Sequence, residues 1–435
     1  MIGGAAAVGA SSLLGAKVAA SSRYSAPAQI RAQDGKVPVT YWTPFGSGVN
    51  GEAQTKLVED FNASQDDIEV THVAYDNYEA IAQALITGLQ TGDAPDVTVF
   101  SQGWWLRFYL SEVLADLNAF ITEETNAEDY NPTFFSEYQR DGGQWAIPFA
   151  RSTPLLYYNN EMVEAAGLTG EVYETWDNLK AMGPDLIEGS DADLAFVFGS
   201  AAGYGAWYLQ SAVWGFGGRY CDDDLNFTLT EEGAVEAGEF MRGLVADGTA
   251  VAVTDPVQDF ITGVSAATFG STGSLGGIRD AVDFDFKTAF LPAQYEEFAC
   301  NTGGSGMSIL NTGAQEQQEG AFRFIEFCTN TENTTFWSQT SGYMPVRTSA
   351  IESEEMQAYF EEDPNAKTAV DQMEHIRAED PVIIMIPNGA QLLGEGWEQI
   401  LVNDRPAEEV WQETTEILET EREPVLDAIA EVEGE

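Results

Sequence analysis

The chain of 435 residues combines an ordinary hydrophobic content of 44% with an extreme charge, since 71 acidic side chains face 19 basic ones and give a formal net charge of −52. This length predicts two or three domains, and the hydrophobic content argues against wholesale disorder. The negative charge repels nucleic acids and anionic lipid headgroups, so DNA, RNA and membrane-surface binding are disfavoured as functions.

The acidic residues are spread along the chain rather than gathered in one tail. Their mutual repulsion would oppose compaction in ordinary salt. At molar salt the Debye length falls to about 3 Å and this repulsion is screened. We therefore predict a halophilic protein; the alternative is an acidic protein of an ordinary environment.

The N-terminal segment predicts export. Residues 1–20 are small and apolar, carry no charge before Lys17, and resemble the hydrophobic region of an export signal. They are too short and too rich in Gly, Ala and Ser for a membrane-spanning helix. Because a basic segment in front of them is missing, we expect the true start to lie upstream and residues 21–36 to form a flexible tether. The predicted location is extracellular, at the cell surface.

Metal and disulfide chemistry have little support in the sequence. The three cysteines, Cys221, Cys300 and Cys328, allow at most one disulfide and match no zinc spacing. There are two histidines, His72 and His375, and the acidic runs are typical of a solvated surface. We predict no cofactor and no metal.

The first part of the chain alternates strands with helices. The predicted elements, in order, are a strand at 37–42, a helix at 52–62, a strand at 68–75, a helix at 78–89 and a strand at 96–100. Either Asp76 or Asn77 can cap the second helix. This β-α-β-α-β order predicts an α/β fold with a parallel sheet covered by helices.

A polar turn separates two strands in the middle of the chain. A strand predicted at 144–149 leads into Arg151, Ser152 and Thr153, and an apolar, aromatic strand follows at 155–158. Polar residues on a segment that crosses between two cores often lie at a ligand. This turn is therefore the first candidate for a binding site.

The second half of the chain repeats the alternation. The elements predicted there are strands at 194–199, 263–269 and 287–291 and helices at 207–214, 231–247, 315–329, 330–340, 352–362, 365–377, 394–401 and after Pro406. Between them, Ser271 to Arg279 combine hydroxyls and glycines at an apparent helix start. A helix N-terminus offers free N–H groups to a phosphate or a sugar hydroxyl, although the same residues also make an ordinary cap.

Eight motifs follow one another in a recognisable order. They are Tyr41-Trp42, Phe61-Asn62-Ala63-Ser64, Asp76-Asn77-Tyr78-Glu79, Gly92-Asp93-Ala94-Pro95, the run from Arg151 to Leu168, Ser271-Thr272-Gly273-Ser274-Leu275, Gly303-Gly304 and Ser341-Gly342-Tyr343-Met344-Pro345. The ordered set resembles family 1 extracellular solute-binding proteins, the ligand-capturing components of ABC importers, and especially their glycerol-3-phosphate-binding members. The resemblance covers nearly all of the chain after about residue 37.

The resemblance implies a two-lobed, periplasmic-binding-protein-like α/β fold of type II, with a ligand cleft between lobes joined by crossover segments. The implied first lobe is 37–149 plus 288–340, and the implied second lobe is 150–287 plus 341–435. The strand predicted at 287–291 would return the chain to the first lobe.

The resemblance also implies candidate ligand contacts. Carried over position by position, they are Tyr78, Gln102, Ser152, Tyr204, Ser271, Gly304 and Tyr343. The relatives have a glutamate where this chain has Gln102, and a tryptophan where it has Tyr204. Aromatic faces stack on the C–H side of sugars and polyols, although most aromatic residues of a large protein lie in its core.

One position departs from the family pattern. Leu393 stands where the glycerol-3-phosphate-binding members have an arginine that takes part in binding, and no arginine lies between Arg377 and Arg405. Losing a guanidinium removes a charge-assisted, bidentate contact to an anion. Arg151 could replace it from the crossover; a salt bridge to one of the many carboxylates is the alternative role for this residue.

We therefore expect an exported, monomeric, non-enzymatic binding protein that delivers a small polar solute to the transmembrane permease subunits of an ABC transporter. The solute would be glycerol 3-phosphate, a glycerophosphodiester or a sugar. The alternative function is an extracellular glycoside hydrolase with paired carboxylates, but nothing in the sequence selects a pair from the 71 acids.

Overall fold

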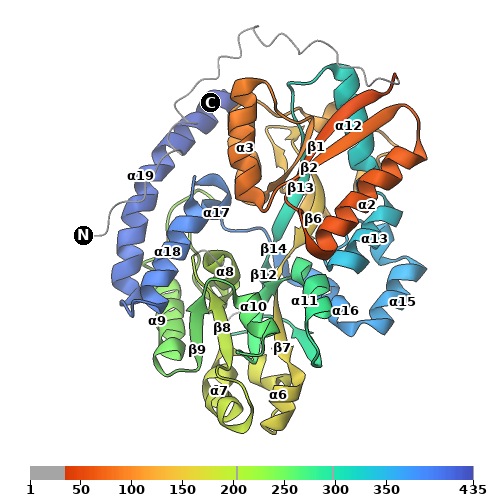
Figure 1. Cartoon of the computed structure of the whole chain (residues 1–435). Coiled ribbons are helices and arrows are strands. Elements are labelled where there is room, and N and C mark those ends of the chain that lie inside the picture. The colour runs from red at the N-terminus through yellow and green to blue at the C-terminus, as the bar shows by residue number, and fades with distance from the viewer. Residues whose placement is uncertain (1–34, 202–203, 296–297, 435) are drawn as a thin grey trace.

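The computed structural model describes residues 35–201, 204–295 and 298–434. The predicted export signal and most of the predicted tether lie outside the described residues. Within them the chain forms two five-stranded sheets, one in each of two lobes (Figure 1). The predicted two-lobed α/β fold is confirmed.

The first sheet is mixed. Its strands, in spatial order, are β2 (Ile68–Ala74), β1 (Val37–Thr43), β3 (Val97–Ser101), β13 (Gly303–Ile309) and β6 (Ile147–Ser152). The first three run parallel, with Val39 opposite Val70 and Tyr41 opposite Val97, whereas β13 is antiparallel to both β3 and β6. The three parallel strands confirm the predicted β-α-β-α-β unit.

The second sheet is built from later segments. Its strands, in spatial order, are β11 (Phe286–Ala289), β7 (Pro154–Asn159), β10 (Ala267–Ser271), β8 (Phe196–Gly199) and β9 (Ala250–Val253). Two short ladders complete the strands: β4 (Gln139–Arg140) with β5 (Gly143–Gln144), and β12 (Cys300–Asn301) with β14 (Ile376–Arg377).

Helices cover both sheets. Those packed on the first sheet or on its covering helices are α2 (Gly48–Ser64), α3 (Tyr78–Thr91), α4 (Gln102–Leu110), α5 (Pro132–Ser136), α12 (Gln315–Cys328) and α13 (Thr331–Ser341). Those packed on the second are α6 (Asn160–Ala165), α7 (Trp176–Gly189), α8 (Gly205–Gly215), α9 (Glu232–Ala246), α10 (Pro256–Ile261), α16 (Pro364–Asp371) and α18 (Gly389–Leu401).

The remaining helices connect these groups. They are α11 (Leu275–Ala281), α14 (Thr348–Ile351), α15 (Glu354–Glu362), α17 (Pro381–Met385), α19 (Ala407–Glu433) and the 3-10 turns η1 (Leu117–Ala119), η2 (Ala127–Asp129), η3 (Gly170–Tyr173), η4 (Thr272–Ser274) and η5 (Gln372–His375). The long helix α19 runs along one side of the molecule (Figure 1). It packs on α9 and α18 and ends at Glu433, which pairs with Arg140 of the other lobe.

The burial pattern explains the layers. Alternate side chains of β3 point to opposite faces, so Val97 and Val99 join one buried cluster while Phe100 joins another. The second sheet has its own large cluster around Trp176, Phe196 and Phe269. Because each sheet has its own buried clusters, the segments that cross between the sheets can carry polar groups.

The strand predicted at 287–291 was expected to return the chain to the first lobe, and this prediction is wrong. Residues Phe286–Ala289 form β11, which pairs antiparallel with β7 in the second sheet, with Lys287 opposite Tyr158. The chain returns to the first sheet only with β13. Strand β13 was not predicted, because Gly303, Gly304 and Gly306 have low strand propensity.

Two predicted helices also differ. The helix expected to begin at Ser271 starts as the 3-10 turn η4, and α11 follows only from Leu275. The helix expected at 365–377 stops at Asp371, and Ile376–Arg377 instead pair with β12. By contrast, α3 is capped by one of the two predicted candidates, Asn77, whose side chain accepts a hydrogen bond from the N–H of Ala80.

Candidate functional site

Three segments pass between the two sheets at one place. Strand β6 ends at Ser152 in the first sheet and β7 begins at Pro154 in the second, so a single residue, Thr153, separates the two sheets. Beside this crossing, the N–H of Thr302 donates to the carbonyl of Arg377 at 2.9 Å, and the N–H of Met344 donates to the carbonyl of Arg151 at 2.8 Å. The candidate residues lie around these crossings.

Aromatic side chains from both halves of the chain meet above the crossing. Tyr78, at the start of α3, donates from its hydroxyl to Oγ of Ser305 at 3.2 Å. Tyr343 stacks on Trp337 with ring centroids 5.8 Å apart and meets Phe45 at the same distance. Burial raises the pKa of both tyrosines, so both stay protonated and offer hydroxyl groups.

The turn at Ser271 lies directly against Tyr343. A Cβ on Gly273 would be 2.5 Å from Cζ of Tyr343, so only glycine permits this approach. Oγ of Ser271 accepts from the N–H of Gly273 at 3.2 Å, while its carbonyl accepts from the hydroxyl of Tyr157 at 2.8 Å. The amide of Asn50 in α2 donates to the carbonyl of Gly273 at 3.4 Å. The turn therefore touches an element of the opposite lobe.

Arg151 is fully buried and already paired. Its guanidinium forms an ion pair with Glu137 and donates to the hydroxyl of Tyr138 at 2.7 Å. The ring of Phe134 lies 5.0 Å from the guanidinium carbon, on the face of the cation. This geometry matches the salt-bridge alternative for Arg151. Its role as an anion receptor stays a prediction, with Nε as its unpartnered nitrogen.

Gln102 continues this polar cluster. Its Nε2 donates to Oγ1 of Thr302 at 3.4 Å, and Thr302 in turn donates to the Glu137 carboxylate. Oε1 of Gln102 is buried without a hydrogen-bond partner. A ligand hydroxyl or amide would satisfy this acceptor, since orphaned buried polar atoms are rare in folded proteins.

Gly304 supplies the backbone of the same wall. It adopts a φ of +87°, and a Cβ there would lie 2.1 Å from the carbonyl oxygen of Ala150 and 2.9 Å from the amide nitrogen of Ser152. Its neighbour Gly303 is covered by the indole of Trp207, which would be 2.4 Å from an added Cβ. Because Gly303 and Gly304 have no side chains, strand β13 can pack directly against the crossover at residues 150–152 and against the indole of Trp207.

Tyr204 closes the group from the second lobe. It caps α8 with a φ of +58°, and its side chain is 53% exposed. Its phenol acts electrostatically on Tyr343 and is itself influenced by Tyr78, which places the three tyrosines close together. The structure therefore brings all eight predicted residues to the crossing region. Their contact with a ligand stays a prediction.

Leu393 takes no part in this region. Its side chain is completely buried on α18 and belongs to the core of the second lobe. The position at which the resemblance implies a binding arginine is thus filled by a packed leucine. No described residue replaces that guanidinium from α18, because Gly389–Leu401 contains no basic side chain.

Sequence reasoning missed two buried carboxyl groups. Glu137 and Glu379 both lie in the cluster with Arg151, and Glu379 is 6% exposed. Burial and the nearby Glu137 raise the pKa of Glu379 to about 8, although Arg151 and the indole of Trp207 oppose this rise. Among 71 acids, no local pattern distinguishes these two, so only the structure could identify them.

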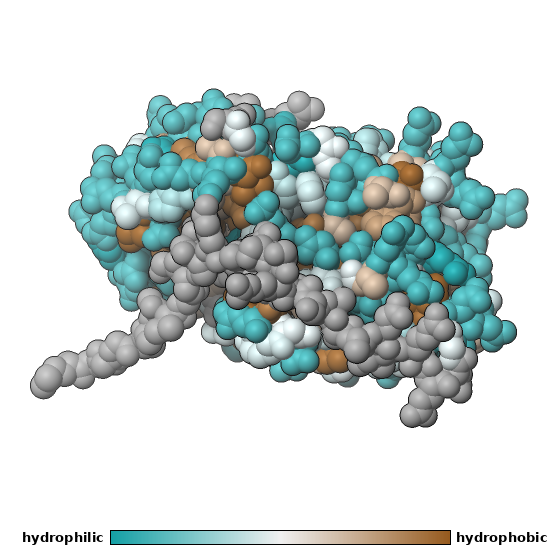
Figure 2. All heavy atoms as spheres, turned by 90° about the horizontal axis from the view of Figure 1, so that it is seen from above, coloured by the Kyte–Doolittle hydropathy of each residue, from teal (hydrophilic) through white to brown (hydrophobic). Residues whose placement is uncertain are grey.

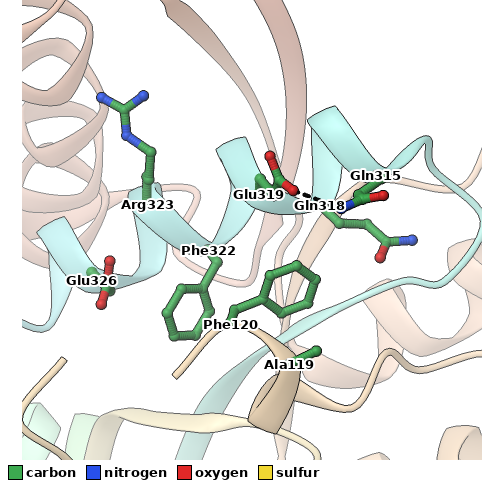
Figure 3. A pocket seen from close by; sticks show the side chains of 8 residues that line it. All are labelled: Ala119, Phe120, Gln315, Gln318, Glu319, Phe322, Arg323 and Glu326. Carbon is green, nitrogen blue, oxygen red and sulfur yellow. Dashed lines mark hydrogen bonds between the residues drawn. The ribbon is translucent and has the colours of Figure 1, made fainter. Parts of the chain in front are cut away.

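A separate hollow lies on the outer side of the first lobe, away from the crossings. Its volume is about 610 Å³, and it is lined by Ala119, Phe120, Gln315, Gln318, Glu319, Phe322, Arg323 and Glu326. Figure 3 shows Phe120 and Phe322 side by side at its base, with the charged side chains on α12 around them. Their rings are stacked with centroids 5.6 Å apart. None of the eight candidate residues lines it.

Other types of site have no support in the described part of the chain. There, no group of three or more potential metal ligands comes together, and no helix is both long and apolar enough to cross a membrane. The three cysteines are buried and unpaired, and burial raises the pKa of each thiol.

The comparison with known proteins identifies the family. A family described as "Bacterial extracellular solute-binding protein" matches residues 56–368, more than half of the chain. The chain belongs to this family. Its members are substrate-binding components of ABC transporters and not enzymes, so the glycoside hydrolase alternative is set aside.

Individual members of the solute-binding family agree with this assignment. The sn-glycerol-3-phosphate-binding periplasmic protein UgpB of Escherichia coli is 26% identical over 356 residues, which cover 76% of this chain and 80% of that protein. The crystal structure of UgpB from Mycobacterium tuberculosis in complex with glycerophosphocholine is 31% identical, with a TM-score of 0.83, and the match covers 90% of this chain and 98% of that one.

More distant members share the fold. The maltose-bound MalE3 of T. maritima has a TM-score of 0.76 at 20% identity, over 88% of this chain and 99% of that chain. At this identity the likeness supports the two-lobed architecture alone. The relation to UgpB confirms the predicted resemblance to the glycerol-3-phosphate-binding branch.

Proposed function

We propose that this protein captures a small hydroxyl-bearing solute, a sugar or a glycerophosphodiester, in the cleft between its lobes. The observation that carries the proposal is the convergence of Tyr78, Tyr343 and the Ser271 turn, from three distant segments, at the crossing between the sheets. Aromatic faces and hydroxyl groups from both lobes are suited to enclose a polyol when the lobes close. The ligands named for the UgpB relatives support this solute class.

The same proposal extends to partners and location. The protein would be exported by the N-terminal segment and act as a monomer outside the cell. It would hand its solute to the transmembrane permease subunits of an ABC transporter, which the family membership supports. The lobes would be built around the two sheets, with the crossings near Thr153, Thr302 and Met344 as the hinge.

The acidic surface supports a halophilic setting. Figure 2 shows hydrophilic side chains over most of the visible face, with apolar residues in small, separate patches. Such a surface, with a net charge of −52, is suited to molar salt, where repulsion between carboxylates is screened. The function should therefore be measured in high salt.

A thermal-shift screen in about 2 M KCl tests the proposed function. Glycerophosphocholine, glycerol 3-phosphate, glycerol, maltose and other sugars are the probes. A solute that binds only the folded protein stabilises it by about 2.7 kcal/mol when its concentration is a hundred times Kd. We expect a rise in Tm with at least one probe, and loss of that rise in Tyr343→Ala.

Tyr295→Ala is the matched control, because Tyr295 is 62% exposed and pairs with Glu236 on the surface. This variant should keep the wild-type response. Stabilisation by none of the probes, or chemical conversion of a probe, would contradict the proposed function.

A further inference from the structure

The charge balance at the crossing is unusual for an anion site. Glu137, Glu379 and Arg151 are each buried, with exposed fractions of 5% for the Glu137 side chain, 6% for Glu379 and 0% for Arg151. The single guanidinium is already bound to Glu137 and Tyr138. The cluster therefore holds two carboxyl groups and one cation, whose two terminal nitrogens already donate to Tyr138 and Glu137.

Glu379 reaches this cluster from the segment that follows β14. It follows Arg377, whose carbonyl accepts from the N–H of Thr302 at 2.9 Å, so its backbone is fixed beside the second crossing. Trp207, which lies flat against Gly303, donates from its indole N–H to the carbonyl of Thr302 at 2.9 Å and interacts with the Glu379 carboxyl group. Glu379 is thus part of the wall formed by Gly303 and Gly304.

Two atoms of the cluster are without protein partners. Oε1 of Gln102 and Nε of Arg151 are buried and make no hydrogen bond. Gln102 is itself only 2% exposed. A wall that contains one orphaned acceptor and one orphaned donor beside a carboxyl group is suited to a hydroxyl group, which both donates and accepts hydrogen bonds.

A phosphate monoester does not fit this wall. It carries about −1.5 to −2 charges at neutral pH and requires unpaired donors when it is desolvated. Here it would lie near Glu137 and Glu379, and Leu393, where the resemblance implies a binding arginine, is a buried apolar residue. A hydroxyl group, in contrast, can donate to a carboxyl oxygen of this wall without bringing further negative charge.

We propose that Glu379 is a specificity-determining residue of the cleft, which accepts hydrogen bonds from hydroxyl groups of a sugar or of the glyceryl end of a phosphodiester and, together with Glu137, excludes a phosphate monoester. This inference rests on the proposed function and selects among its solute classes.

The proposal predicts a pH dependence of binding. The pKa of free Glu379 is raised to about 8, and a hydroxyl donor favours the ionised carboxylate. Affinity for a neutral polyol should therefore fall by up to about tenfold for each pH unit below about 8. The charged groups that face Glu379 are Glu137, Arg151 and Asp380, and Asp380 is held by Arg219.

Calorimetric titration of the full chain in about 2 M KCl tests the inference. Maltose, glycerophosphocholine and glycerol 3-phosphate are titrated into the wild type, Glu379→Gln and Glu374→Gln at about pH 6 and about pH 9. Glu374 is an exposed neighbour on η5, so its variant removes the same charge outside the cleft. Maltose and glycerophosphocholine distinguish the two sources of the hydroxyl group.

We expect the wild type to bind one of the two neutral or zwitterionic probes at least about tenfold more tightly than glycerol 3-phosphate, and more tightly at the higher pH. Glu379→Gln should weaken this binding by about tenfold or more and abolish its pH dependence, whereas Glu374→Gln should behave as the wild type. Glu379→Asp keeps the charge, so it should keep the pH dependence even if Glu379→Gln fails to fold.

Equal or tighter binding of glycerol 3-phosphate by the wild type would overturn the inference and leave the proposed function standing. A wild-type affinity for the polyol that does not change with pH would also overturn the inference and leave the proposed function standing. So would a Glu379→Gln variant that binds as tightly as the wild type. Failure of the wild type to bind any of the three probes would contradict the proposed function, and the inference with it.

Discussion

Gly304 lies so close to Ala150 that a Cβ on the glycine would be 2.1 Å from the alanine carbonyl oxygen. The strands β13 and β6 approach here at an irregularity in their register, and Gly304 adopts a φ of +87°. Both features exclude a side chain. The contact joins the second crossing to the first, next to the amide of Ser152.

Gly304→Ala should therefore destabilise the protein. The positive φ alone costs about 1–3 kcal/mol for a residue with a Cβ, and the collision adds to this cost. A lower Tm in molar salt checks the prediction. Gly277→Ala is the control, because nothing lies within 4 Å of its added Cβ on helix α11 and alanine is the better helix former. A wild-type Tm for Gly304→Ala would show that the two strands are further apart.

Removing one partner of the Arg151–Glu137 ion pair should destabilise the protein more than removing both. Arg151→Met leaves the Glu137 carboxylate buried without its cation, which typically costs about 3–5 kcal/mol. In Arg151→Met/Glu137→Gln the uncompensated charge is absent, so the double variant should be more stable than Arg151→Met. Urea unfolding of the wild type, Arg151→Met, Glu137→Gln and the double variant gives the coupling energy; additive effects would contradict the pairing.

Stability should respond to pH through Glu379. Its folded pKa is raised to about 8, from an ordinary value of 4.5, so folding favours the protonated form. The stabilisation of the fold by protonated Glu379 is fully present below about pH 4.5 and is lost as the pH rises through about 8. Glu379→Gln, which stays neutral, should have the Tm of the wild type near pH 4.5 and a higher Tm near pH 9.

The ligand-free protein should be used for this comparison, since a bound solute shifts the pKa in the opposite direction. Glu374→Gln controls for the lost surface charge. An unchanged or lower Tm of Glu379→Gln near pH 9 would mean that the carboxylate is well solvated in the fold.

The net charge of −52 predicts a strong response to salt. Raising KCl from about 0.1 M to about 2 M shortens the Debye length from about 10 Å to below 3 Å, so Tm should rise by about 10 °C or more. KCl is preferred to sulfate, which stabilises folded proteins of any charge by exclusion from their surface. A flat or falling Tm would contradict the predicted adaptation to high salt.

The sequence by itself determined the local elements and the family. The first strand, predicted at 37–42, and a helix cap at Asp76 or Asn77 are properties of neighbouring residues, and the structure has β1 at Val37–Thr43 and the cap at Asn77. The ordered motifs also predicted the two-lobed architecture and seven candidate ligand contacts, and the contacts stay a prediction. These signals are short-range, because each depends on backbone preferences or on a contiguous motif.

The tertiary structure decided which polar groups share one environment. Glu379 is far from Glu137 and Arg151 in the chain, and their meeting depends on how the crossings pack between the two sheets. Long-range strand pairing also makes the glycine-rich segment from Gly303 a strand and places β11 in the second sheet. Burial and electrostatic coupling arise only when the sheets assemble, so the charge balance of the cleft could not be predicted from any local pattern.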